Sequence, residues 1–247
     1  MYDDAIARWS VVDPMAEKRG WLTPYNFVQN NPLAKIDPNG MLDDNLTALK
    51  DGTIEVQKTT DKFDKFFVEN NDGSRQQVAQ LDRYKSSDGE TDLVTFPESG
   101  QGYTRYSKID EGGDHSVQPL VAAALFGAIN QLIESHPNVI VQLGDMSTIN
   151  GGKPGNEHNG GRLSHINGKN IDVRYIRGDN KLMPLNVDSP QFDKNANQAM
   201  VNSFNHFGFK NILSQTNKNG VLLNGTINKG HYDHLHLQGF NPKIITK

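Results

Sequence analysis

The sequence predicts an α+β fold in which helices flank a small antiparallel sheet, preceded by a β-rich spacer and an irregular N-terminal tail. Three observations predict the C-terminal part of this fold. Residues 118–134 place apolar side chains at helical spacing, with Pro119 in the first turn. Residues 139–143 form an apolar run of strand length, and residues 171–176 alternate with period two. We therefore predict three regions: 1–41, 42–94 and 95–247.

Composition predicts a loop-rich globular protein with a modest core. Of 247 residues, 35% are hydrophobic, and the mean hydropathy is -0.63. The longest apolar run, 119–126, is far shorter than the ~20 residues that a bilayer requires. We expect no membrane partner.

Charge and cysteine content exclude other classes. The net charge of -4 and scattered Lys and Arg residues give no basic surface for nucleic acid. The absence of cysteine excludes disulfides and thiolate ligands, so any zinc must be held by His and carboxylate side chains. The start of the chain lacks the features of a secretory signal, so we expect delivery by another route if the protein acts outside the cell.

Residues 1–41 are rich in aromatic residues and turn signals and have no periodic segment; Asp13 and Asp37 each precede a proline. The segments 2–9, 10–14, 24–26 and 30–32 resemble the end of an RHS-repeat core domain. Residues 32–41 also match that family's Pro-x4-Asp-Pro-x-Gly-Leu cleavage motif, with Met41 in place of Leu. The resemblance implies a β-cage shell that encloses a toxin, with Asp13 and Asp37 as the aspartate pair that cuts after Met41.

The region 42–94 predicts a β-rich spacer of short strands and polar turns. Strands are expected at 53–57 and 66–68, and hairpin turns at 71–74 and 86–89. No catalytic constellation occurs in it.

The C-terminal region predicts further elements after the first helix and strand. The glycine-rich loop 148–161 suits a substrate rim. Residues 193–207 predict a helix capped by Ser189 or Asp193. The chain then predicts a hairpin-like run at 221–223, a turn at 228–230 and a strand at 234–238.

Histidines cluster in this region, because six of the chain's eight lie in the segment from His158 to His236. His165 and Asp172 could supply two metal ligands from one strand and loop unit. His234 and His236 are two residues apart, so on a strand both side chains face the same side. Zinc takes three protein ligands in catalytic sites and keeps one position open for water. The pattern therefore predicts a Zn²⁺ site with one free imidazole beside it.

The spacing of Ser164-His165, Gly168 and Asp172, followed by His231-x-x-His234-x-His236, resembles the penicillin-insensitive murein endopeptidases and the wider group of lysostaphin-like, D-Ala-D-Ala and hedgehog-fold zinc proteins. Residues 144–147 also resemble part of that pattern, and the similarity spans about residues 115–240. It implies His165, Asp172 and His236 as zinc ligands. It also implies His234 as general base or transition-state stabiliser, with His231 assisting at the substrate.

Two departures from the family pattern concern the surroundings of the metal. Arg162 stands where the family has a histidine, and His158 is a candidate to take that place from the longer loop. Residues 169–172 replace a Leu-Asp-Val-Asp run. Asp145 is expected to cap a helix or a loop rather than to act in catalysis. Asp233, of opposite strand parity to His234, could orient an imidazole.

Together the two resemblances imply an RHS-delivered antibacterial toxin. The expected activity is zinc-dependent hydrolysis of D-alanyl peptide cross-links of peptidoglycan in the periplasm of a target bacterium. The enzyme would be a murein endopeptidase or a D,D-carboxypeptidase-like hydrolase. The expected partners are the peptidoglycan peptide, the RHS shell and a cognate immunity protein. Two alternatives remain: an RHS-associated metal-dependent nuclease, and a zinc-containing module that binds the cell wall without cutting it.

Overall fold

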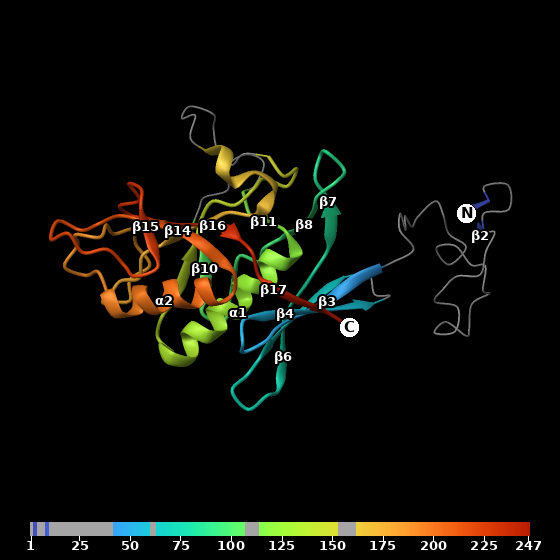
Figure 1. The fold of residues 1–247 in the computed structure, drawn as a ribbon, viewed down its shortest axis with the longest axis horizontal. Helices are drawn as coiled ribbons and strands as arrows, with labels where there is room; N and C mark the ends of the chain where they lie inside the picture. The colour runs from blue at the N-terminus through green and yellow to red at the C-terminus, as the bar shows by residue number, and fades with distance from the viewer. Residues whose placement is uncertain (1, 4–7, 10–41, 60–62, 107–113, 153–161) are drawn as a thin grey trace. The chain divides into compact units, whose positions relative to one another are not determined.

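The computed structural model describes residues 2–3, 8–9, 42–59, 63–106, 114–152 and 162–247 (Figure 1). Within these residues the protein is mixed α+β and mostly β, with two α-helices and several sheets, as predicted in outline. No helix among them is long and apolar enough to cross a membrane.

The chain divides into two compact units, residues 1–42 and 43–247. In the first, β1 (Tyr2–Asp3) pairs antiparallel with β2 (Arg8–Trp9). The proposed self-cleavage residues Asp13, Asp37 and Met41 lie outside the described residues. In the second, the predicted boundary at residues 94 and 95 falls inside one compact unit.

A five-stranded sheet joins the spacer region to the end of the chain. Its order is β17-β4-β3-β5-β6, and its strands are β3 (Leu42–Ala48), β4 (Thr53–Thr59), β5 (Asp64–Glu69), β6 (Arg75–Leu81) and β17 (Lys243–Thr246). β5 and β6 form the hairpin predicted around residues 71–74, with Gly73 at φ 80°. β17 pairs parallel with β4, a long-range contact that the sequence did not predict.

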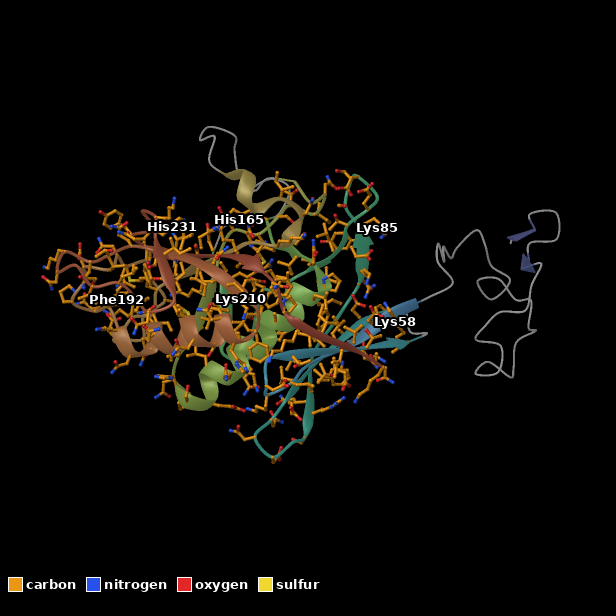
Figure 2. All side chains as sticks on the ribbon, viewed as in Figure 1. Lys58, Lys85, His165, Phe192, Lys210 and His231 are labelled. Carbon is orange, nitrogen blue, oxygen red and sulfur yellow. The ribbon has the colours of Figure 1, made fainter. Side chains whose placement is uncertain are left out.

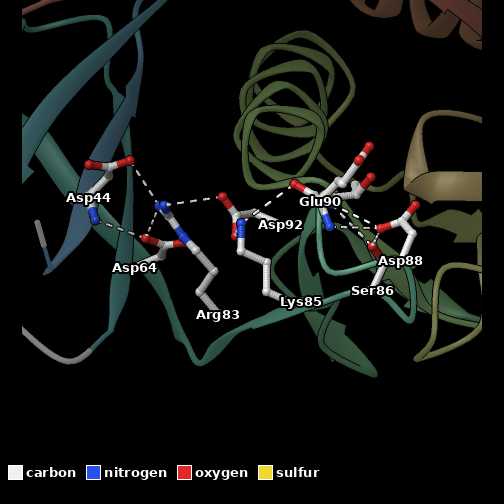
Figure 3. Close-up of polar contacts among 9 residues, drawn as sticks. Asp44, Asp64, Arg83, Lys85, Ser86, Asp88, Glu90 and Asp92 are labelled. Atoms are coloured by element: carbon white, nitrogen blue, oxygen red, sulfur yellow. Dashed lines mark hydrogen bonds and ion pairs between the residues drawn. The ribbon is translucent and has the colours of Figure 1, made fainter. Parts of the chain in front are cut away.

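A three-stranded sheet of order β11-β8-β7 follows, from β7 (Arg83–Lys85), β8 (Asp92–Thr95) and β11 (Ser116–Val117). β7 and β8 form the second predicted hairpin, around residues 86–89. Arg83 links this sheet to the five-stranded one, because its guanidinium donates at 2.9 Å to both Asp64 and Asp44 (Figure 3).

Helix α1 (Pro119–Ser135) packs against β5, β8 and the second helix, α2 (Lys194–His206). Pro119 stands in the first turn as predicted, where its missing N–H costs no hydrogen bond. Gly127 allows close packing, since a Cβ there would lie 2.4 Å from the Phe207 ring. Of the two caps proposed for α2, Asp193 is the one used, and its carboxylate accepts from the Ala196 N–H at 2.9 Å.

The largest sheet has seven strands in the order β15-β14-β16-β13-β12-β10-β9. These are β9 (Ser99–Gly100), β10 (Tyr103–Arg105), β12 (Val141–Leu143), β13 (Ile171–Arg174), β14 (Phe209–Ser214), β15 (Thr226–Asn228) and β16 (His234–Phe240). The pairs among β12, β13, β16 and β14 are antiparallel, whereas β10–β12 and β14–β15 are parallel. The sheet is thus larger than the small antiparallel one predicted.

The strand alternation predicted for β13 is confirmed: Ile171 and Val173 are fully buried, and Asp172 lies on the opposite face. The run 221–223 is not a strand, so that prediction is wrong. Leu223 is a buried loop residue, and β15 begins at Thr226 and pairs parallel with β14.

Candidate metal centre

Three side chains from separate segments meet on one face of the seven-stranded sheet: His165, Asp172 and His236. Their ligand atoms all lie within 4.8 Å of one another, so the group could hold a metal ion. Oδ1 of Asp172 lies 2.7 Å from Nδ1 of His236 and 3.5 Å from Nε2 of His165. The imidazoles are almost wholly buried, with side-chain exposures of 5% and 4%.

His165 is positioned by the 3-10 segment η3 (Arg162–Gly168), which turns back through two left-handed residues, Asn167 at φ 63° and Gly168 at φ 64°. Glycine is required at 168, since a Cβ there would lie 2.6 Å from Cα of Val117. Gln118, which precedes α1, donates from its backbone to the Gly168 carbonyl and from its side chain to the Asn167 carbonyl. These bonds tie the loop that carries His165 to the buried helix.

Asp172 and His236 are positioned by strand register. β13 and β16 are antiparallel, and Asp172 stands directly opposite His236 while Arg174 stands opposite His234. Opposed residues project to the same face. His234 therefore lies beside the group, with its Nε2 3.7 Å from Oδ1 of Asp172.

The remaining two residues of the second motif surround His234. Asp233 Oδ1 lies 2.7 Å from Nδ1 of His234, on the ring's far side from Asp172. The His231 ring lies 4.9 Å from that of His234 and 5.6 Å from that of His236. Figure 2 labels His165 and His231 near each other in the upper part of the view. The Tyr175 hydroxyl donates to the His231 carbonyl at 2.8 Å and so fixes this turn.

Asp172 and the neighbouring histidines shift one another's pKa values. Burial raises the pKa of Asp172, but hydrogen bonds with His165 and His236 outweigh it, so the net pKa is well below the usual range. Burial lowers the pKa of His165, but the contact with Asp172 outweighs it and leaves the pKa raised. For His231, burial and the neighbouring His234 both lower the pKa. Asp172 is thus an anion in the folded protein, which a cation site requires.

The donor set suits a divalent metal of the zinc type. In tetrahedral zinc sites, Zn–N and Zn–O bonds of about 2.0–2.1 Å place ligand atoms roughly 3.3 Å apart. Nδ1 of His165 lies 3.2 Å from the Asn170 carbonyl, which leaves Nε2 toward Asp172. A ligand histidine typically has such a partner on its outer nitrogen. Nδ1 of His231 is buried without a hydrogen-bond partner among the described residues.

The other predicted residues are placed as follows. Asp145 is half-buried; its carbonyl accepts from the Asp172 N–H at 3.0 Å, and its carboxyl group hydrogen-bonds with that of Asp114. Arg162 and Ser164 belong to η3, and their side chains lie outside the described part of the structure. His158 lies outside the described residues.

Two residues that the sequence analysis missed also lie on this face. Arg174 follows Asp172 by two residues and so shares its face; the same period-two reasoning could have found it. The guanidinium carbon of Arg174 lies 3.6 Å from the centre of the Tyr106 ring. Tyr106 gave no sequence signal, because the three-residue strand β10 before it was not predicted.

Neither a protein-family model nor a curated protein matches this chain. The two resemblances stated from the sequence therefore stay predictions, and the geometry of the site carries the functional argument.

Proposed function

We propose that the protein is a zinc-dependent peptidase that hydrolyses D-alanyl peptide cross-links of peptidoglycan. One observation carries the proposal: His165, Asp172 and His236 converge within 4.8 Å, with a fourth group, His234, beside them and more exposed. Two imidazoles and one carboxylate form the three-ligand set of catalytic zinc sites, which differ from four-ligand structural sites in leaving a coordination position open.

When bound, zinc would polarise the scissile carbonyl and lower the pKa of the attacking water to about 7. His234 would act as the general base. Its Nε2 faces the ligand group, and Asp233 contacts its Nδ1 at 2.7 Å. A histidine held in this way can accept the proton of the water and deliver it to the leaving amine as the C–N bond breaks. His231, in ring contact with His234, is placed to assist at the substrate.

The substrate class follows from the resemblance of the His165–Asp172 and His231–His236 motifs to murein endopeptidases. Delivery as an antibacterial toxin into a rival's periplasm follows from the resemblance of residues 1–41 to an RHS core. Such a toxin needs a cognate immunity protein in the producing cell. A nuclease is the less favoured alternative, because the net charge of -4 offers little attraction for phosphates.

The test is mass spectrometry of purified cross-linked muropeptide dimers after incubation with the zinc-loaded chain. We expect conversion to monomers, with the mass of one water added per bond cut. Intact dimers from a chain that verifiably holds zinc would contradict the peptidase. Cleavage of DNA or RNA under the same conditions would support the nuclease, whereas dimer binding without cleavage would support the cell-wall binding module.

A further inference from the structure

Arg174 lies on the same sheet face as the candidate metal centre. It is two residues from Asp172 on β13 and directly opposite His234 on β16. Two residues along a strand span roughly 6.5 Å. Arg174 therefore lies about two extended peptide residues from Asp172, on the sheet face that carries the candidate metal centre.

The Arg174 side chain is held on an aromatic platform. Its guanidinium stacks on the Tyr106 ring at 3.6 Å and donates weakly to Oε1 of Gln142 at 3.4 Å. The Tyr106 ring in turn lies across Gly144, where a Cβ would approach the Tyr106 hydroxyl oxygen to 2.2 Å. Gly144 donates its N–H to the Asp172 carbonyl at 2.7 Å. The residue against which the Tyr106 ring packs is therefore hydrogen-bonded to the backbone of the proposed metal ligand Asp172.

Among the described residues, Arg174 forms no ion pair with a carboxylate. Its side chain instead donates a hydrogen bond to Gln142 and stacks on Tyr106. By contrast, Arg75, Arg83 and Arg177 each pair with an aspartate or glutamate. Arg174 is half-buried, and Asp233 acts on its charge without forming an ion pair with it. A partly desolvated cation that lacks a direct carboxylate partner is stabilised when a ligand supplies one. The planar guanidinium matches a carboxylate with two parallel hydrogen bonds.

We propose that Arg174, held over Tyr106, binds a substrate carboxylate carried by the carbon atom that bears the leaving amine. This inference rests on the proposed peptidase function and specifies its substrate: a peptide whose residue after the scissile bond has a free acid at that position. Arg174 is then a specificity-determining residue, and Tyr106 is a positioning residue that acts through it.

The test compares two cross-linked muropeptide dimers that differ only at this group, a free carboxylate in one and a carboxamide in the other. With the full chain loaded with zinc, we expect kcat/KM to be roughly 10–100-fold higher for the free acid, since hydrogen bonds between charged groups are lost with the amide. The difference should lie mainly in KM.

Variants assign the effect to Arg174. Arg174→Ala should abolish the difference in kcat/KM between the free acid and the amide and should keep its zinc. Arg174→Lys, which keeps the charge without the planar fork, should restore part of the preference. Arg177→Ala is the matched control, because Arg177 is already engaged by Asp179. Tyr106→Ala should reduce the preference, and adding it to Arg174→Ala should cause no further loss.

Equal rates of the wild type on both dimers, or an acid preference that survives in Arg174→Ala, would overturn the proposal. If the zinc-loaded wild type cuts neither dimer, the proposed peptidase function is wrong. The carboxylate site is then tested separately, by measuring ligand binding with calorimetry. In that case the wild type should bind a free-acid D-alanyl dipeptide more tightly than its amide, and Arg174→Ala should not. Equal binding of the two by the wild type would overturn the site itself.

Discussion

Asp172 is the residue on which the site depends. One of its oxygens lies within 3.7 Å of three imidazoles, those of His165, His234 and His236. Its strongly lowered pKa shows that the folded protein favours the anion despite burial. A carboxylate surrounded by three histidines, two of them buried, is poorly explained by structural needs alone, because the histidines must be desolvated to reach it.

We expect His165→Ala and Asp172→Ala to lose zinc. Removing a ligand should weaken zinc affinity by more than the 10–100-fold typical of losing an outer hydrogen-bond partner. Metal content after equilibrium dialysis, measured by elemental mass spectrometry, checks this. His136→Ala, whose ring contacts Ser135 away from the cluster, should keep zinc as the wild type does. Zinc retained by both ligand variants would contradict the assignment.

At the residue scale, the spacing of two residues between His234 and His236 was sufficient to predict a shared face, because strand side chains alternate strictly. The same rule places Arg174 with Asp172. Tyr106 was not predictable, since its contact with Arg174 depends on the pairing of β10 with β12, residues about 40 positions apart. A contact made by long-range pairing leaves no local pattern in the sequence.

At the scale of elements, Arg83 joins two sheets through a nearly buried charge network. Asp64 from β5 is fully buried and Asp44 from β3 is nearly so, and Lys58 also contacts Asp44 at 3.0 Å. Burial raises the pKa of Asp64 even though Arg83 opposes the shift. Arg83 is therefore what permits a carboxylate at a site that excludes water.

Arg83→Met should destabilise the protein by about 3–5 kcal/mol, the usual result of removing one partner from a buried ion pair. The loss should grow as pH rises. Without Arg83 the folded-state pKa of Asp64 should rise further above its usual value. When the folded-state pKa of a carboxyl group exceeds its unfolded-state pKa, the folded protein becomes less stable as pH rises between the two values. Urea denaturation at pH 4 and pH 7 measures the difference.

Lys85→Met is the control for this prediction. Lys85 pairs with Asp92 at 2.8 Å, but both side chains are well exposed, at 46% and 39%. Exposed pairs contribute about 0–1 kcal/mol. A similar small loss for Arg83→Met, or a loss independent of pH, would contradict the role given to Arg83.

Elements with local signals were predictable, and elements made by distant pairing were not. Helix α1 was predictable from its apolar spacing and its N-terminal proline, α2 from its aspartate cap, and the hairpins from their Asx–Gly turns. β15 and β17 were missed because each pairs parallel with a strand elsewhere. Exposed edge strands such as β17 also lack the apolar alternation that would reveal them.

At the scale of the whole molecule, the ligands come from three separated segments: η3, β13 and β16. A metal that binds all three should stabilise the folded state and have little affinity for the unfolded chain. At a free zinc concentration 100-fold above Kd, the gain is about 2.7 kcal/mol. For a unit of this size that corresponds to a rise in Tm of roughly 5–10 °C.

Calorimetry with zinc and with a chelator measures this gain. His165→Ala should unfold at the same temperature in both conditions, since it lacks a complete ligand set. An equal zinc effect on the wild type and on this variant would mean that zinc binds elsewhere, and the predicted coupling between the site and the fold would be wrong.

Turnover of cross-linked muropeptide dimers by the wild type and by His234→Ala, at equal and verified zinc occupancy, tests the zinc peptidase function and the role of His234 together. His234 lies beside the ligand group without belonging to it. We predict that the variant keeps its zinc and loses about 10²–10⁴-fold in kcat, the range for a general acid–base. Undiminished turnover by the zinc-loaded variant would contradict the role of His234, and no turnover by the wild type would contradict the peptidase itself.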